Sequence, residues 1–243
     1  MINIECLGSG SSGNGYIVTC NEESLIIECG IRFSSALKAL HFNLRNIRGA
    51  LVSHCHSDHA AYAKQYAEKG IIIYTTKGTL DAINLPVGGA GVFMEKKRIY
   101  IIGKFKVMAF ATEHDAADPC GFIIDCHDGN RICFATDTYY LRYKFPDVTI
   151  YMLECNYEEK ILQRNIKNGI VHPSVGERVR KSHMSVRQCI GTLTSNDLSK
   201  VKLILLIHLS KDNSNAEVFK SQVEEATGKL VYVAKKGLKA QVF

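Results

Sequence analysis

The sequence predicts an α/β protein in which two β-sheets pack face to face and helices cover their outer faces. Short apolar segments typical of strands alternate with helix-like segments in both halves of the chain, which favours this layered arrangement. The 243 residues, 46% of them hydrophobic, are enough for one large core. The chain has four prolines and no repeat, low-complexity tract or obvious linker, so we expect one domain over residues 1–243.

The expected elements are short apolar runs bounded by turn-forming or charged residues. In the first half we expect strands over 2–7, 16–19, 25–28, 47–52 and 71–74, and helices over 34–41, 58–69 and 77–83. In the second half we expect strands over 105–110, 121–126, 131–135, 148–153, 202–207, 229–233 and 239–242, and helices over 185–195 and 215–227.

Composition and charge indicate the compartment of the protein, the state of its cysteines and the kind of partner it could bind. Residues 1–5 lack the basic start and long apolar segment of a secretory signal, and the longest apolar runs are too short to span a bilayer, so we expect a cytoplasmic protein without membrane contact. Nine cysteines without CxxC spacing indicate free thiols, most of them buried, in a reducing compartment. The formal charge of +6 agrees with a polyanionic partner such as nucleic acid, although such a charge is also common elsewhere.

Four candidate metal ligands lie within residues 54–59, directly after a predicted strand. His54 and His56 are two positions apart, so an extended chain turns both imidazoles to the same face. Asp58 and His59 follow at the start of the next helix and can reach a second position. Because one ion needs only three or four ligands, this density predicts two adjacent metal ions, the arrangement used to hydrolyse phosphate and acyl esters.

Three further candidates, His114, Asp137 and His208, each follow a predicted strand, where binding sites usually lie. Taken alone, each of these residues is more often an ordinary polar side chain than a metal ligand. Together with the first cluster, however, they provide enough ligands for two ions. We expect His54, His56 and His114 on one ion, Asp58, His59 and His208 on the other, and Asp137 as a bridge. A bridging carboxylate offsets the repulsion between two cations, and a hydroxide shared between them is the expected nucleophile. The nitrogen and oxygen donors suit zinc or manganese.

This order of ligands resembles the motifs of the metallo-β-lactamase-fold superfamily over nearly the whole chain. The resemblance implies a four-layer αββα sandwich, and the 71 positions between Asp137 and His208 leave no room for an inserted β-CASP domain. Segments 7–14, 113–119 and 207–213 most resemble the YycJ/WalJ group, which is similar to bacterial 5′-3′ DNA exonucleases and related to RNase J and other β-CASP nucleases.

The resemblance also implies roles beside the metals. Glu28 stands where the superfamily usually has a supporting aspartate, and it can make the same bonds to a metal ligand. Glu154 and His183 correspond to a pair that β-CASP nucleases hold near the metals, in which the histidine is proposed to protonate the leaving oxygen. His183 is alternatively a residue at a helix start. Asp58, His183 and Glu154 are thus the predicted catalytic residues.

Substrate contacts are predicted where polar residues gather near the expected site. The Gly- and Ser-rich segment 8–15 is either a permissive turn or a loop that approaches the metals or a phosphate. Arg178, Arg180 and Lys181 are interpreted either as a solvated charged loop or as phosphate contacts. The residues predicted to bind substrate are Ser11, Asn14, Ser185, Ser210, Lys211 and Asn213.

These observations predict a dinuclear metal-dependent phosphodiesterase with two Zn or Mn ions and a metal-bridging hydroxide as nucleophile. Its expected substrate is nucleic acid, with DNA favoured over RNA, cut as by a 5′-3′ exonuclease. The alternative is a phosphodiesterase that hydrolyses small cyclic nucleotides, for which a homodimer closing the pocket would be an indication. A binding protein without catalysis is disfavoured, because all seven metal positions carry a ligand residue.

Overall fold

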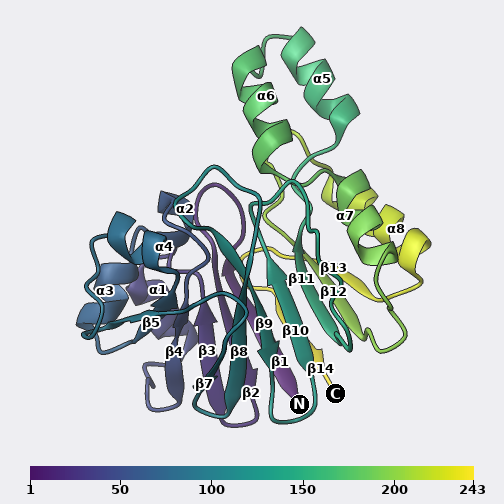
Figure 1. Ribbon diagram of the computed structural model, residues 1–243. Helices are drawn as coiled ribbons and strands as arrows, with labels where there is room; N and C mark the ends of the chain where they lie inside the picture. The colour runs from purple at the N-terminus through teal and green to yellow at the C-terminus, as the bar shows by residue number, and fades with distance from the viewer. The chain divides into compact units, whose positions relative to one another are not determined.

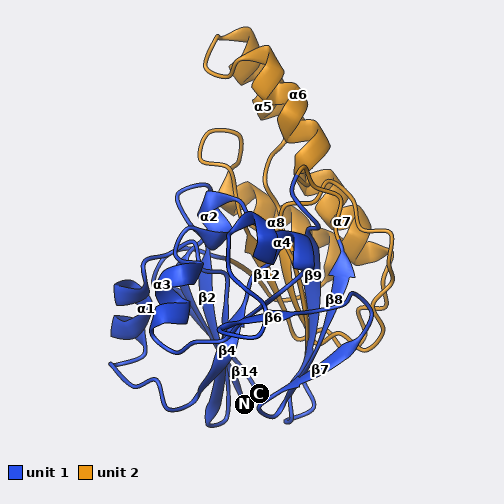
Figure 2. Cartoon of the chain, turned by 60° about the vertical axis from the view of Figure 1, so that its left-hand side comes forward, with its two compact units in different colours: residues 1–111, 116–131, 234–243 blue, residues 112–115, 132–233 orange.

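The computed structural model describes residues 1–243 as two compact units, coloured separately in Figure 2. Unit 1 comprises residues 1–111, 116–131 and 234–243, and unit 2 comprises residues 112–115 and 132–233. The expectation of a single domain over 1–243 stays a prediction. No helix is long and apolar enough to cross a membrane.

The first sheet of unit 1 has seven strands in the order β14-β1-β2-β3-β4-β5-β6 (Figure 1). The strands are β1 (Ile2–Gly8), β2 (Gly15–Cys20), β3 (Glu23–Ile27), β4 (Ile47–Leu51), β5 (Ile73–Thr75), β6 (Gly91–Phe93) and β14 (Lys239–Val242). Strands β14, β1, β2 and β3 pair antiparallel, whereas β3 to β6 pair parallel. The carboxyl ends of β3 and β4 therefore meet at one edge, which brings the loops after them together.

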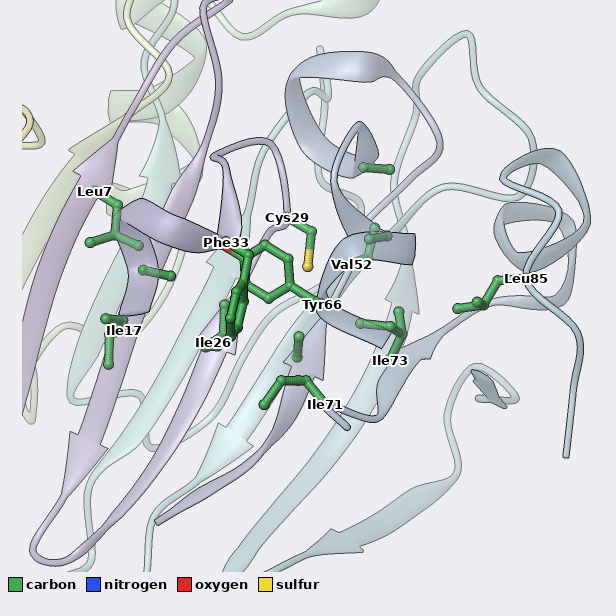
Figure 3. Close-up of a cluster of buried hydrophobic side chains, with 14 of the residues drawn as sticks. Leu7, Ile17, Ile26, Cys29, Phe33, Val52, Tyr66, Ile71, Ile73 and Leu85 are labelled. Atoms are coloured by element: carbon green, nitrogen blue, oxygen red, sulfur yellow. The ribbon is translucent and has the colours of Figure 1, made fainter. Parts of the chain in front are cut away.

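Helices α1 (Phe33–Ala39), α2 (Ser57–Ala60), α3 (Ala63–Glu68) and α4 (Lys77–Ala82) belong to the same unit. Apolar side chains from helices and strands form the buried cluster drawn in Figure 3. At its centre the rings of Phe33 and Tyr66 meet edge to face, with centroids 5.1 Å apart. The Tyr66 hydroxyl donates to the carbonyl of Ile31 over 3.0 Å, so burial of this ring leaves its polar atom satisfied.

The second sheet has the strand order β13-β12-β11-β10-β9-β8-β7. Its antiparallel strands β7 (Ile99–Ile102), β8 (Phe105–Ala111) and β9 (Cys120–Asp125) belong to unit 1. Its parallel strands are β10 (Arg131–Ala135), β11 (Ile150–Glu154), β12 (Leu203–Ile207) and β13 (Val231–Val233), which belong to unit 2 apart from the first residue of β10. Strands β11 and β12 are buried along their whole length, as expected for parallel strands covered on both faces.

Unit 2 carries the helices α5 (Glu159–Lys167), α6 (Pro173–Ser182), α7 (Val186–Thr194) and α8 (Ala216–Thr227). In Figure 1, α7 and α8 lie beside the strands of this unit, whereas α5 and α6 form a hairpin that extends away from them. The hairpin has a small apolar core of its own, centred on Leu162. Arg180 on α6 also contacts the Glu159 carboxylate on α5, with Nη2 and Oε1 2.7 Å apart.

The structure corrects two sequence expectations. The helix predicted over 58–69 is divided into α2 and α3, because the backbone N–H of Tyr62 donates to the carbonyl of Cys29 over 3.0 Å instead of continuing the helix. The charged segment with Arg178, Arg180 and Lys181, for which a loop was one interpretation, lies in α6. The short strands β6 and β7 and the helices α5 and α6 were not predicted.

Candidate active site

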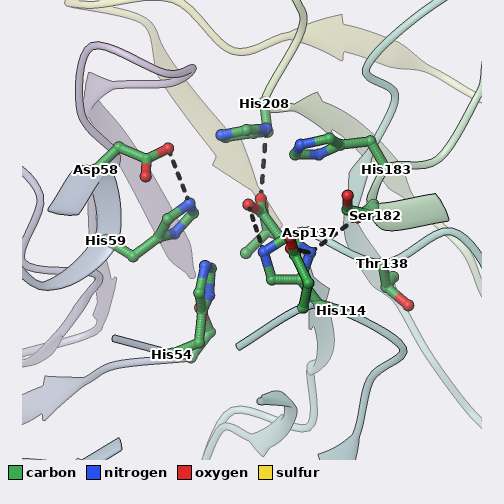
Figure 4. A network of polar contacts seen from close by, with 12 residues as sticks. His54, Asp58, His59, His114, Asp137, Thr138, Ser182, His183 and His208 are labelled. Atoms are coloured by element: carbon green, nitrogen blue, oxygen red, sulfur yellow. Dashed lines mark hydrogen bonds and ion pairs between the residues drawn. The ribbon is translucent and has the colours of Figure 1, made fainter. Parts of the chain in front are cut away.

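In unit 1, the candidate ligands lie on the loop that follows β4 and on the short helix α2. The ring of His54 lies 4.8 Å from that of His56 and 4.2 Å from that of His59, measured between centroids. His54 and His59 are almost completely buried. Asp58, in the first turn of α2, reaches His59 with 3.2 Å between Oδ2 and Nε2, a contact marked in Figure 4. The predicted cluster of unit 1 is therefore present as a group of neighbouring side chains.

A second layer of polar groups orients these imidazoles. Nδ1 of His54 lies 2.9 Å from the hydroxyl of Ser53. Nδ1 of His59 lies 3.4 Å from Oε2 of Glu28, and the other Glu28 oxygen accepts from the Ser53 backbone N–H over 3.2 Å. These contacts direct Nδ1 of both rings toward protein partners and place Nε2 on the opposite side of each ring.

Glu28 is fully buried, and it follows β3 in the left-handed conformation, with φ 67°. Burial raises the pKa of Glu28, although the neighbouring His59 acts in the opposite direction. These contacts agree with the interpretation of Glu28 as a support residue in place of the usual aspartate. From this position the longer glutamate side chain reaches His59.

The Gly-rich segment after β1 also supports this loop. Asn14 is buried, and its amide nitrogen lies 3.4 Å from Oδ2 of Asp58 and 3.1 Å from Nε2 of His59. Its backbone N–H donates to the carbonyl of Asp58 over 2.7 Å. A Cβ on Gly30 would lie 1.7 Å from that same carbonyl oxygen, so only glycine fits there. Asn14, predicted to bind substrate, therefore holds two candidate metal ligands in place.

In unit 2, Asp137 lies between two of the predicted histidines (Figure 4). Its Oδ2 is 3.5 Å from Nε2 of His114, and its Oδ1 is 3.4 Å from Nδ1 of His208. Asp137 lies two residues after β10 and His208 directly after β12, and both adopt left-handed conformations, with φ 46° and 55°. Left-handed backbone at a non-glycine residue is strained and often marks a functional site.

His114 has a defined orientation. Its Nδ1 lies 3.0 Å from the backbone carbonyl of Ser182 and therefore donates to it, which leaves Nε2 on the side of Asp137. Burial lowers the pKa of His114, although Asp137 opposes this, so the ring is neutral near pH 7. A neutral imidazole with its Nδ1–H on a carbonyl is the form in which histidine binds a divalent ion.

Glu154 and His183 form a close pair, with Oε1 and Nδ1 2.6 Å apart. Glu154 is fully buried, and its other oxygen accepts from the backbone N–H groups of Thr138 and Met184 over 2.9 and 3.2 Å. Burial alone would raise the pKa of Glu154, but the charge and hydrogen bond of His183 lower it below its usual value. Burial likewise opposes protonation of His183, yet Glu154 raises the pKa of this ring. The predicted pair is therefore in place.

The ring of His183 stacks on that of His208, with centroids 5.5 Å apart and planes 13° from parallel. The side-chain oxygens and ring nitrogens of four residues of unit 2 lie within 4.8 Å of one another: Asp137, Glu154, His183 and His208. Sequence reasoning missed Asn156, whose amide nitrogen lies 3.2 Å from Nδ1 of His208 and donates to its carbonyl over 2.8 Å. A polar residue two positions after the buried strand β11 was the available signal. No signal in the sequence pointed to Ser182, because it contacts His114 through its backbone carbonyl.

The other predicted substrate residues occupy different environments. The side chains of Ser11 and Lys211 are exposed. Ser185 caps α7 in a capping box with Gln188. Ser210 accepts from the backbone N–H of Asn213 over 3.2 Å, and the Asn213 side chain is buried. For Ser185 and Asn213 the described contacts are structural, and substrate binding by this set stays a prediction.

Comparison with known proteins places these clusters in a known fold. The metallo-β-lactamase-fold protein YhfI from Bacillus subtilis superimposes with a TM-score of 0.78 at 16% identity, covering 98% of each chain. This likeness confirms the predicted fold class. The chain thus has the metallo-β-lactamase fold and, together with the relatives described next, is identified as a metal-dependent hydrolase.

Curated relatives match most of the chain. Exodeoxyribonuclease YycJ from Bacillus anthracis is 27% identical over 241 residues, which cover 92% of this chain and 88% of the relative. Exodeoxyribonuclease WalJ from Streptococcus pneumoniae is 25% identical over 228 residues, covering 87% and 83% of the two chains. The family model of the anti-Pycsar protein Apyc1 matches residues 3–80. The relatives confirm the resemblance to the YycJ/WalJ group and support a metal-dependent nuclease or phosphodiesterase.

Proposed function

We propose that this chain is a dinuclear metal-dependent nuclease that degrades DNA from its 5′ end. In this proposal the ligands of the two units act on one pair of divalent ions. The first ion is bound by His54, His56 and His114 and the second by Asp58, His59 and His208, with Asp137 shared between them. The identity of the ions, zinc or manganese, belongs to the proposal.

One observation carries the metal assignment: three of the predicted histidines direct Nδ1 toward a protein partner. The partners are the Ser53 hydroxyl for His54, the Glu28 carboxylate for His59 and the Ser182 carbonyl for His114. Such partners fix the tautomer and the ring orientation of metal-binding histidines and increase the basicity of the other nitrogen. The donor set of imidazoles and carboxylates also fits Zn²⁺ or Mn²⁺.

The two ions, once bound, would supply an acidified water as nucleophile and neutralise charge on the phosphate. The step left to the chain's own residues is protonation of the leaving oxygen. His183 keeps its Nδ1 on Glu154, so the proton on its Nε2 can pass to the departing oxygen of the cleaved phosphodiester. Burial favours loss of this proton, but Glu154 raises the pKa of His183 above its usual value and so favours its retention. The 20% exposure of the His183 side chain gives a substrate access to it.

The similarity to the two exodeoxyribonucleases supports DNA as the substrate. The formal charge of +6 agrees with a polyanionic substrate. The experiment is a substrate panel incubated with Zn²⁺ or Mn²⁺, containing 5′-labelled single- and double-stranded DNA, RNA, cyclic mononucleotides and bis(p-nitrophenyl) phosphate. The proposal predicts that the 5′ label on DNA is released first, as a mononucleotide or short product.

Matched variants separate this activity from contaminating nucleases. His56→Ala and Asp137→Asn should abolish hydrolysis, whereas His172→Asn should retain it, because His172 is exposed and asparagine preserves its N-cap position on α6. Turnover of cyclic mononucleotides with no degradation of DNA would contradict the nuclease and establish the alternative phosphodiesterase. Activity that survives Asp137→Asn would contradict both.

A further inference from the structure

A second group of metal-binding side chains lies in unit 1, away from the catalytic candidates. Cys20 is the last residue of β2, and Cys126, His127 and Asp128 form the turn that follows β9. Cys20 pairs with Glu23 at the beginning of β3. Since β3 and β4 run parallel and His54 follows the end of β4, Cys20 lies at the opposite end of this sheet from His54. The group therefore has no part in the proposed hydrolysis.

The spacing of the donor atoms fits a single ion. The two thiol sulfurs of Cys20 and Cys126 and a carboxylate oxygen of Asp128 all lie within 4.8 Å of one another. Nε2 of His127 lies 3.9 Å from Sγ of Cys20. Tetrahedral zinc, with Zn–S of about 2.3 Å and Zn–N or Zn–O of about 2.0 Å, separates its ligand atoms by about 3.3 to 3.8 Å. Small side-chain movements therefore bring the two thiols and the Asp128 carboxylate around one ion, and His127, which contacts Cys20 alone of these three, has to turn toward it as the fourth donor.

We propose that Cys20, Cys126, Asp128 and His127 bind one structural Zn²⁺ ion. Two thiols favour a soft divalent cation over Mg²⁺, Ca²⁺ or Mn²⁺. Binding releases the two thiol protons to solvent, and no oxidant or reductant is required. Two thiolates and one carboxylate around Zn²⁺ leave one net negative charge.

The turn that carries three of these donors is already ordered. The backbone N–H of Cys126 donates to the carbonyl of Asn130 over 2.8 Å, and the N–H of Asn130 donates to Oδ1 of Asp128 over 3.1 Å. Besides these small movements, binding requires a change at His127, whose Nε2 lies 3.0 Å from the amide nitrogen of the exposed Asn21 and must leave it. Because both thiols are buried and His127 is exposed, the ion enters from the side of the imidazole.

The bound ion would link the β2–β3 turn to the turn after β9. Such a cross-link between distant parts of the chain stabilises the folded state through the free energy of metal binding. The site is separate from the proposed catalytic ions, because none of their ligands is a cysteine. A spectroscopic signal specific to thiolate ligands therefore reports on this site alone.

The experiment is a titration of the reduced, metal-free 243-residue chain with Co²⁺, followed by Zn²⁺. Thiolate coordination of Co²⁺ produces an intense charge-transfer absorption in the near ultraviolet. We expect this absorption to saturate at one ion per chain and to disappear when Zn²⁺ displaces Co²⁺. It should be lost in Cys126→Ser and persist in Asp137→Asn, which affects only the proposed catalytic ions.

Two cysteine controls make the assignment specific. Cys55→Ser, beside the catalytic candidates, and Cys133→Ser, buried within β10, should both retain the absorption. If Cys126→Ser does not fold, Asp128→Asn provides the test: it keeps both thiols and should weaken Co²⁺ binding by at least about tenfold. Absence of the absorption in the reduced wild-type chain would overturn the proposal. So would its persistence in a folded Cys126→Ser, or unchanged affinity in Asp128→Asn.

Discussion

The hydrogen bond between Glu154 and His183 gives these two residues different tasks. Glu154 cannot reach solvent, since it is fully buried and already accepts two backbone N–H groups. It can only orient His183 and maintain its charge. His183 remains partly exposed and is the member of the pair that can meet a substrate. The contribution of the histidine should therefore depend on how much the leaving oxygen needs a proton.

Replacement of His183 by alanine tests this dependence. Cleavage of DNA, which has a poor alkoxide leaving group, should slow about 10²- to 10⁴-fold. Hydrolysis of bis(p-nitrophenyl) phosphate should change little, because nitrophenolate departs without a proton. The measurement is kcat for both substrates, together with the metal content of the variant. An equal loss on both substrates, or loss of bound metal, would contradict a role as general acid.

Glu28 allows a second test at this scale. Glu28→Gln keeps the size of the side chain but removes the negative charge beside Nδ1 of His59. Loss of such a partner typically weakens metal binding about 10- to 100-fold. Glu28→Asp restores the carboxylate and should recover most of this affinity, with isothermal titration of Mn²⁺ as the measurement. If both variants bind metal like the wild type, the carboxylate does not support the site.

At the scale of elements, close contact between backbones shapes the loop that carries Asp58. Two segments approach its carbonyl: Asn14 donates to it, and Gly30 packs directly against it. The loop is thereby fixed from two sides before any side chain is considered. The geometry of the loop therefore depends on the absence of a Cβ at Gly30.

Gly30→Ala should therefore displace the loop. An added Cβ lies 1.7 Å from a carbonyl oxygen, so we expect both lower stability and weaker metal binding. Gly191→Ala is the matched control: Gly191 lies in α7 with open space around its Cβ position, and alanine there should stabilise the chain by about 0.5 to 1 kcal/mol. Urea unfolding of both variants provides the measurement. A Gly30→Ala chain as stable as the wild type would refute this account of the loop.

The same scale explains what could be predicted from sequence. The strands with continuous apolar runs, such as β11 and β12, and the polar residues after them were visible, because burial and chain direction determine both. The hairpin of α5 and α6 could not be predicted in this way. Only a few apolar residues, centred on Leu162, form its core, and the rest of its surface is charged. The contact that Ser182 makes through its backbone carbonyl could not be predicted, because every residue type has that carbonyl.

At the scale of the whole molecule, metal binding should couple to stability. In the proposed site the ligands come from segments between residues 54 and 208, and unfolding would disperse them, so bound ions should stabilise the native state. One ion present at 100 times its Kd contributes about 2.7 kcal/mol, which corresponds to an increase in Tm of about 5 to 10 °C for a chain of this size.

Thermal unfolding with and without Mn²⁺ measures this coupling. Mn²⁺ is chosen because it binds poorly to thiolates and so reports on the proposed catalytic ligands. The metal-free wild-type chain should gain stability on addition of Mn²⁺, whereas Asp137→Asn, which lacks the shared carboxylate, should gain much less. An equal increase in Tm for both chains would mean that Mn²⁺ binds elsewhere.

Diffraction from crystals grown with Mn²⁺ and measured at an energy where manganese scatters anomalously tests the proposed dinuclear site most directly. The account predicts two anomalous peaks about 3.5–4 Å apart, both in contact with Asp137. One peak should contact His54, His56 and His114, and the other Asp58, His59 and His208. A single peak, or two peaks away from Asp137, would contradict the dinuclear site on which the proposed hydrolysis depends.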